Sequence, residues 1–182
     1  MIKIEITDSG VVDAFNRLIA LGENPRGALE SIGEVVEQFT KQSFQLSEDP
    51  YGNPWAANTD ATLQAVLRRK QKNEGKIYKK KDGSINKAGL NYLTGKKPLI
   101  ETGDLSHNIS WAVDETSVVV SSIFPYAAMQ QFGGTKSEFP NLWGDIPARP
   151  FFPNEEQGFP DELKQHIDEV LRTAIQNAID GV

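Results

Sequence analysis

The N-terminal part of the chain shows two hydrophobic periods. Isoleucine at every second position of residues 2–6 predicts a half-buried strand. Apolar side chains then recur at helical spacing, first over 11–19 and again over 28–39, with Gly22 and Pro25 between the two runs. This part is therefore predicted to form a strand followed by two helices.

The middle of the chain loses this regularity. Residues 49–55 are dense in turn formers and predict irregular structure, while 59–72 predict a short helix. Residues 73–97 contain several glycines and lysines but almost no apolar period. We therefore expect a long, flexible, basic loop over 73–97.

In the C-terminal half, apolar residues again occur at every second position, as is typical of strands. Residues 109–113 and the β-branched run 118–120 predict a β-hairpin. A short helix is expected over 125–132, an extended segment over 147–152, and a long amphipathic helix from Pro160 onward. The pattern predicts an α+β fold, with a small antiparallel sheet packed against two or three helices. Because no interdomain linker is evident, we expect a single domain over residues 1–182.

Composition removes several classes of function. The chain has no cysteine, which excludes disulfides, thiolate metal sites and cysteine nucleophiles. Charged residues interrupt the N-terminal isoleucines, so we expect no signal peptide. No stretch approaches the roughly 20 apolar residues that span a bilayer. We expect a soluble product that is cytoplasmic when made and has no membrane partner.

The net charge of −6 hides a strong asymmetry. Residues 68–97 contain eleven basic and two acidic residues, a charge of +9, whereas the remainder carries −15. Such a segment can bind an acidic protein or make non-specific contacts with DNA, or it can be a solvated loop. The candidate contact residues are the two arginines and four of the lysines: Arg68, Arg69, Lys70, Lys79, Lys80 and Lys81.

The residues that could carry catalysis are few. Glu162, His166 and Glu169 lie on adjacent turns of the last predicted helix and are compatible with an ion site, although a solvated acidic face explains them more simply. Residues 133–137 end in Lys-Ser after two glycines, but no glycine directly precedes Lys136, as a phosphate loop requires. We expect no enzymatic activity and no cofactor.

Several large aromatic side chains lie in or beside irregular segments, where they must pack on the body of the protein or on another subunit. They are Trp55, Phe139, Trp143, Phe151 and Phe152. Arginine accompanies aromatic residues at many interfaces, and Arg149 lies close to the last two. Both core packing and an oligomer interface stay open for this group.

Four separated signatures occur in order along the chain. They are DPYGNPWA at 49–56, LIETGDL at 99–105, YAAMQQFGG at 126–134 and IPARPFF at 146–152. Together they resemble the phage virion morphogenesis family, the tail-completion proteins of Mu-like phages. The residues that carry the resemblance are Trp55, Gly103, Tyr126, Gln131, Phe132, Gly133, Arg149, Pro150 and Phe151.

The resemblance implies an α+β domain of the neck or tail-terminator kind, acting as a ring at the head–tail junction or tail end. It implies no cofactor and no reaction. Its expected partners are further copies of the chain and phage tail-tube or head-connector proteins, in the host cytoplasm during assembly and then in the virion. Within that family reading, Trp55 and residues 148–151 would fix loops against the sheet, and Tyr126, Gln131 and Phe132 would pack a short helix. No role for the basic insertion follows from the resemblance.

Charge complementarity agrees with an assembly role. An acidic body and a basic arm can make head-to-tail contacts, and contacts of this kind close into rings. Two other hypotheses remain: a DNA-binding accessory protein that uses the basic segment Arg68–Lys97, and a metal-dependent hydrolase that uses Glu162 and His166.

Overall fold

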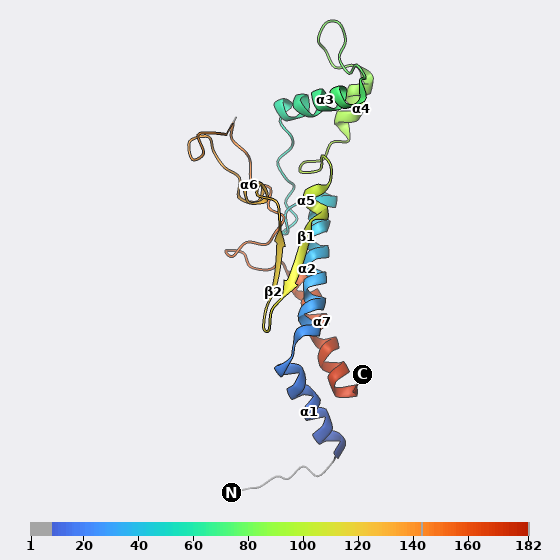
Figure 1. Ribbon diagram of the computed structural model, residues 1–182, viewed down its shortest axis with the longest axis vertical. Coiled ribbons are helices and arrows are strands. Elements are labelled where there is room, and N and C mark those ends of the chain that lie inside the picture. Colours follow the sequence, from blue (N-terminus) through green and yellow to red (C-terminus); the bar gives the residue numbers. More distant parts are fainter. Residues whose placement is uncertain (1–8, 143, 182) are drawn as a thin grey trace. The chain divides into compact units, whose positions relative to one another are not determined.

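The computed structural model describes residues 9–142 and 144–181, so the strand predicted at 2–6 lies outside the described residues. Figure 1 shows the order of the elements along the chain. They are α1 (Ser9–Glu23), α2 (Arg26–Leu46), α3 (Asp60–Glu74), α4 (Lys87–Thr94), α5 (Asp104–His107), β1 (Ile109–Val113), β2 (Val118–Ser122), α6 (Ala127–Phe132) and α7 (Asp161–Asp180). The predicted α+β class is confirmed.

The chain divides into two compact units. Unit 1 contains residues 1–40, 109–121 and 153–182, and unit 2 contains residues 41–108 and 122–152. The expectation of a single domain over the whole chain stays a prediction.

Unit 1 is built on a helix–hairpin core. Strands β1 and β2 form the predicted antiparallel hairpin, and Val120 from it packs on the buried side chains of Val36, Phe39 and Leu163. These three residues come from α2 and α7, so the hairpin packs against two helices. A Cβ at Gly33 of α2 would stand 2.7 Å from the ring of Trp111 in β1. The close approach of β1 to α2, visible in Figure 1, therefore depends on the missing side chain.

Helices α1 and α7 also contact each other within unit 1. The guanidinium of Arg17 donates from Nε to the carbonyl of Ala178 at 2.7 Å and from Nη2 to that of Ile179 at 2.6 Å. The last carbonyls of a helix have no intrahelical partner. Arg17 therefore caps the C-terminus of α7 from a residue distant in sequence.

Part of the predicted flexible loop is a helix. Residues 87–94 form α4, which the side chain of Asn86 caps by accepting from the Gly89 amide at 2.9 Å. A bridge between Lys79 and Ile85 orders the segment before it. The prediction of a loop throughout 73–97 is therefore wrong. Helix α4 is fixed by a side-chain cap and a preceding turn, and neither of these produces a hydrophobic period in the sequence.

Two smaller differences concern the ends of elements. Helix α2 continues to Leu46, beyond the last residue of its apolar stripe at position 39, and α5 is a single turn that the sequence did not predict. Helix α3 matches the prediction, with Val66 and Leu67 buried. In the described part of the chain, every helix is too short or too polar to cross a bilayer.

Candidate functional site

The four sequence signatures meet in unit 2, where they form what we call the motif cluster. The indole Nε1 of Trp55, in the first signature, donates to the carbonyl of Pro150, in the last, at 2.7 Å. The ring of Phe44 packs edge-on against Trp55 at 5.3 Å between centroids and against Phe151 at 5.2 Å. Segments about 95 residues apart are thus joined by one hydrogen bond and by the packing of three aromatic rings at edge-on and tilted angles.

Arg149 makes a second connection between the same two segments. Its Nε donates to the carbonyl of Ala56 at 2.8 Å and its Nη2 to that of Ala57 at 3.1 Å. Only 8% of the residue is exposed, and burial lowers the pKa of its guanidinium. We expected this segment to be fixed against the sheet, but these hydrogen bonds fix it to residues 56 and 57.

Gln131 holds the other side of the same strand-like segment. Its Oε1 accepts from the amides of Phe151 at 2.9 Å and Phe152 at 3.0 Å, and its Nε2 donates to the carbonyl of Phe152 at 2.9 Å. The side-chain amide therefore satisfies backbone groups of residues 151 and 152, as a neighbouring strand would. Its buried position agrees with the expectation that Gln131 packs α6.

Gly133 allows the chain to turn sharply after α6. Its φ is +72°, and a Cβ there would lie 2.7 Å from the amide nitrogen of Ala148. Directly after it, Gly134 and Ile146 exchange two backbone hydrogen bonds, of 2.9 and 2.8 Å. The third and fourth signatures are therefore joined through backbone atoms, at a position where only glycine fits.

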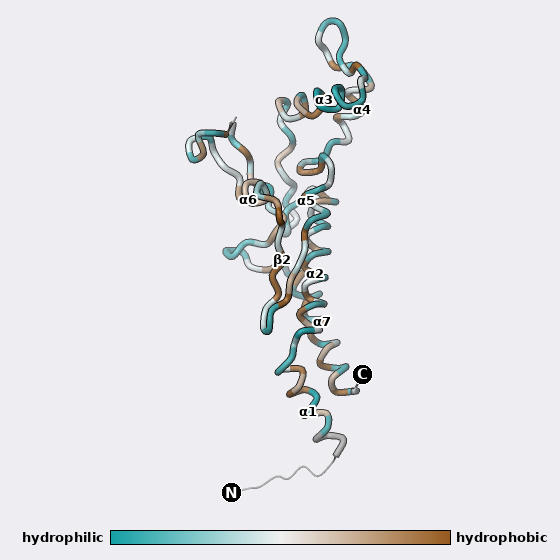
Figure 2. Tube along the Cα trace, viewed as in Figure 1, coloured by the Kyte–Doolittle hydropathy of each residue, from teal (hydrophilic) through white to brown (hydrophobic). Residues whose placement is uncertain are grey.

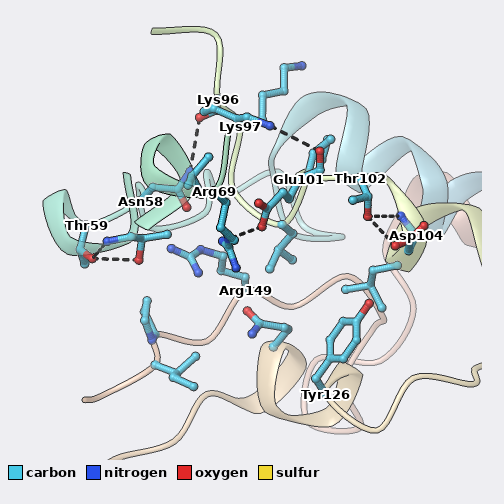
Figure 3. Close-up of a pocket in the computed structure, with 18 of the residues that line it drawn as sticks. Asn58, Thr59, Arg69, Lys96, Lys97, Glu101, Thr102, Asp104, Tyr126 and Arg149 are labelled. Atoms are coloured by element: carbon cyan, nitrogen blue, oxygen red, sulfur yellow. Dashed lines mark hydrogen bonds and ion pairs between the residues drawn. The ribbon is translucent and has the colours of Figure 1, made fainter. Parts of the chain in front are cut away.

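The second signature closes the cluster around a cavity of about 360 Å³ in unit 2 (Figure 3). Gly103 has a φ of +87°, and a Cβ there would lie 2.7 Å from the imidazole of His107. The turn buries Leu105, which lines the cavity together with residues of the third and fourth signatures. We refer to this space as the Arg149 cavity, because Arg149 is the buried charge in its lining.

The charged groups at the Arg149 cavity are of both signs. Arg69 pairs with Glu101 at 2.8 Å, which Figure 3 marks with a dashed line. Asp104 accepts a 2.5 Å hydrogen bond from the hydroxyl of Thr102, and the oxygen of Asp145 accepts from the amide of Lys136 at 2.7 Å. Each of these carboxylates has a partner other than Arg149.

Two residues of the third signature are more exposed than a packing role requires. Phe132 is 76% exposed and Tyr126 is 45% exposed. The expectation that Phe132 packs α6 is therefore wrong. Its helical neighbour Gln131 points inward, so Phe132, one position on, is turned by about 100° to the outside of the helix. A large apolar side chain in this position is available for another chain.

The basic candidates occupy α3 and the turn after it. Arg68, Arg69 and Lys70 lie on α3, while Lys79, Lys80 and Lys81 lie in or beside the turn bridged by Lys79 and Ile85. Figure 2 shows this turn as a hydrophilic part of the chain. Arg68 and the three lysines of the turn form no ion pair with any described residue.

Lys70 has a different environment from the other basic candidates. It pairs with Glu74 and lies 4.3 Å from the ring centroid of Tyr92. The hydroxyl of Tyr78 also donates to Glu74 at 2.7 Å. The hydrogen bonds from Lys70 and Tyr78 lower the pKa of Glu74 to about 2. Lys70 therefore serves to join α3 to the following segment.

Two candidates for chemistry remain, the ion site on the last helix and the glycine-rich turn, and the geometry of the described residues supports neither. Within residues 9–142 and 144–181, no group of three or more acidic or histidine side chains is arranged to hold a metal, and this includes the surroundings of Glu162 and His166. In the glycine-rich turn 133–137, the Lys136 amide faces the Asp145 carboxylate, where a phosphate loop would need an open anion site.

Comparison with known proteins gives one family. Residues 6–91 match the model of the phage virion morphogenesis family. No significant match was found among curated proteins or among solved structures. The matched region includes α1, α2, α3 and the first signature, with Trp55 at the centre of the motif cluster. Over residues 6–91, this chain is therefore similar to the phage virion morphogenesis family.

Proposed function

We propose that this chain is a structural protein of the phage or prophage particle that acts in tail completion or head–tail joining, by forming or capping a ring. The observation that carries the proposal is the match of residues 6–91 to the virion morphogenesis family. Its partners are further copies of itself and tail-tube or head-connector proteins, which it meets in the host cytoplasm and accompanies into the virion.

The chemistry of the motif cluster supports a role in assembly. Trp55, Gln131 and Arg149 use their polar atoms to bind backbone groups of the same unit. In the same unit, Ile123 is 71% exposed and Phe132 is 76% exposed. Polar groups committed to the fold, together with exposed apolar side chains, favour a protein that works by contact with other chains.

The direct test is to examine the particles that form in the absence of this protein. An early stop codon in the gene of the phage or induced prophage should give heads and tails that are separate or incomplete in electron micrographs. Supplying the protein from a plasmid should restore complete particles. Complete, infectious particles in the absence of the protein would contradict the proposal.

DNA contact is the second candidate, and one feature of the surface favours it. Arg68, Lys72, Lys76 and Lys79 line a single open concavity between α3 and the following turn in unit 2. Such a surface would bind phosphates without reading bases. Fluorescence anisotropy with random duplex DNA should then show affinity that falls steeply with salt and is lost in a Lys79→Gln, Lys80→Gln, Lys81→Gln triple variant. Salt-independent binding, or none, would exclude this function.

A further inference from the structure

The Arg149 cavity contains a buried positive charge without a counter-ion among the described residues. Arg149 is 8% exposed, and its two hydrogen-bond acceptors, the carbonyls of Ala56 and Ala57, are neutral. A guanidinium stays protonated at any physiological pH. A buried charge is costly unless an opposite charge accompanies it. The cavity is therefore suited to an anion that another molecule supplies.

The donors of Arg149 define the shape of that anion. A guanidinium carries five N–H groups in one plane, and the two hydrogen bonds to the alanine carbonyls use Nε and Nη2. Nη1 makes no hydrogen bond to any described residue. A planar carboxylate matches such a donor edge with two parallel hydrogen bonds.

The lining of the cavity disfavours a nucleic acid as the source of the anion. Glu101, Asp104 and Asp145 all contribute to the lining, so a chain of phosphates would meet three carboxylates. A space of about 360 Å³ also admits side chains and not a duplex. A single carboxylate on a polypeptide can instead bind between these groups.

An acidic turn of this chain offers suitable carboxylates. Glu155 and Glu156 are exposed and form no ion pair with any described residue. The turn is ordered, because the Gln157 amide donates to Oδ1 of Asn154 at 2.8 Å and the Gly158 amide to its carbonyl at 2.9 Å. Phe159, directly after the turn, is 50% exposed. The turn therefore presents two carboxylates to a positive partner, with an aromatic ring beside them that can add apolar contact.

We propose that the Arg149 cavity of one copy binds a carboxylate of the Glu155–Glu156 turn of a second copy. The contact is head-to-tail, because the two surfaces differ, and repetition of such contacts closes a ring or extends a filament. The large acidic excess outside residues 68–97 makes a second copy a suitable source of a carboxylate for Arg149. This inference rests on the proposed function as a ring-forming protein and identifies the contact that builds the ring.

The test is the mass of the purified full-length protein in solution, measured by light scattering after size exclusion over a range of concentrations. The wild type should associate, and Glu155→Gln with Glu156→Gln should weaken association by about thirtyfold or more, as loss of a buried charge partner does. Gln130 also lines the cavity. The variant Gln130→Glu would supply a carboxylate from the same chain, which should compete with that of the second copy and weaken association. Because Arg149 itself supports the fold, it is left unchanged.

A matched control separates this contact from the effect of net charge. Glu162→Gln with Glu169→Gln removes two exposed carboxylates from α7 and changes the charge equally, so association should stay at the wild-type level. Equal association of both double variants, or a wild type that is monomeric at every concentration, would overturn the inference. If the Glu155–Glu156 variant still gives complete particles while the stop codon does not, only the carboxylate contact fails and the proposed function stands.

Discussion

The helix–hairpin core of unit 1 and the motif cluster of unit 2 are held together by different interactions. In unit 1, Val36, Phe39 and Leu163 exclude water by apolar contact, from elements whose hydrophobic period is visible in the sequence. In unit 2, Gln131 and Arg149 donate to or accept from backbone groups of irregular segments. Irregular segments have no ladder to satisfy their amides and carbonyls, so single polar side chains must do so.

This difference explains how a chain with only 38% hydrophobic residues supports two compact units. Apolar contacts depend mainly on area and tolerate a change of shape within limits. A buried hydrogen-bonding side chain has a fixed geometry, and its loss leaves several backbone groups without a partner. The two units should therefore respond to different kinds of substitution.

The largest expected effect is loss of apolar volume in unit 1. Leu163 is fully buried, and Leu163→Ala should lower the free energy of unfolding by about 3–5 kcal/mol. Chemical denaturation measures the loss, and hydrogen exchange should locate it in α2, α7 and the hairpin. Leu171→Ala is the matched control on α7, where the side chain is 41% exposed, and it should cost much less. Equal losses would mean that burial does not govern unit 1.

The next effect tests the polar side of the comparison. Gln131→Leu keeps the approximate size of the side chain but removes three hydrogen bonds to Phe151 and Phe152. We expect a loss of about 2–3 kcal/mol in the free energy of unfolding, with faster hydrogen exchange at those two amides. Gln130→Leu is the control, because its side chain makes no such bonds to described residues. A neutral Gln131→Leu would show that apolar packing also dominates unit 2.

The comparison also shows what could be predicted from the sequence. Helices α2, α3 and α7 and the β1–β2 hairpin follow from hydrophobic period, which reports one buried face. The four signatures indicated that Gln131 and Arg149 matter, but not what they bind. Their partners are carbonyls and amides, which every residue carries, so no pattern of side chains identifies them.

Two failures have the same physical origin. Helix α4 depends on the Asn86 cap and on the stacking of Tyr78 and Tyr92, whose ring centroids lie 6.4 Å apart, and neither has a period. The resemblance implied that Phe132 packs the short helix, but neither a shared signature nor hydrophobicity states which side of a short helix faces inward. The cavity itself arises from segments far apart in sequence, and could not be predicted.

A smaller effect tests how closely the hairpin fits its helix. Gly33→Ala places a Cβ 2.7 Å from the ring of Trp111 and should cost about 1–2 kcal/mol through overpacking. Gly27→Ala on the same helix meets no atom within 4 Å and should stabilise by up to about 1 kcal/mol, because alanine favours helix. Thermal unfolding followed by circular dichroism should move in opposite directions for the two variants. The same direction for both would contradict the close approach.

The smallest expected effect extends the comparison to exposed charge, at Glu74. The pKa of this carboxyl is lowered from 4.5 to about 2, first by the hydrogen bond from Lys70 and then by that from Tyr78. A lowered pKa in the folded state means that the charged carboxylate favours folding above pH 4.5, and that this contribution is lost as the pH falls toward about 2. Because the group is exposed, solvent screening should keep the change in stability small.

NMR titration of the Glu74 carboxyl carbon measures the pKa directly. Lys70→Met should raise it most, Tyr78→Phe less, and Lys76→Met least, since Lys76 acts only through its charge at 3.5 Å. A Glu74 pKa that is unchanged by Lys70→Met would mean that α3 is not joined to the following segment through this pair, and the basic surface would then lack the support that orders it.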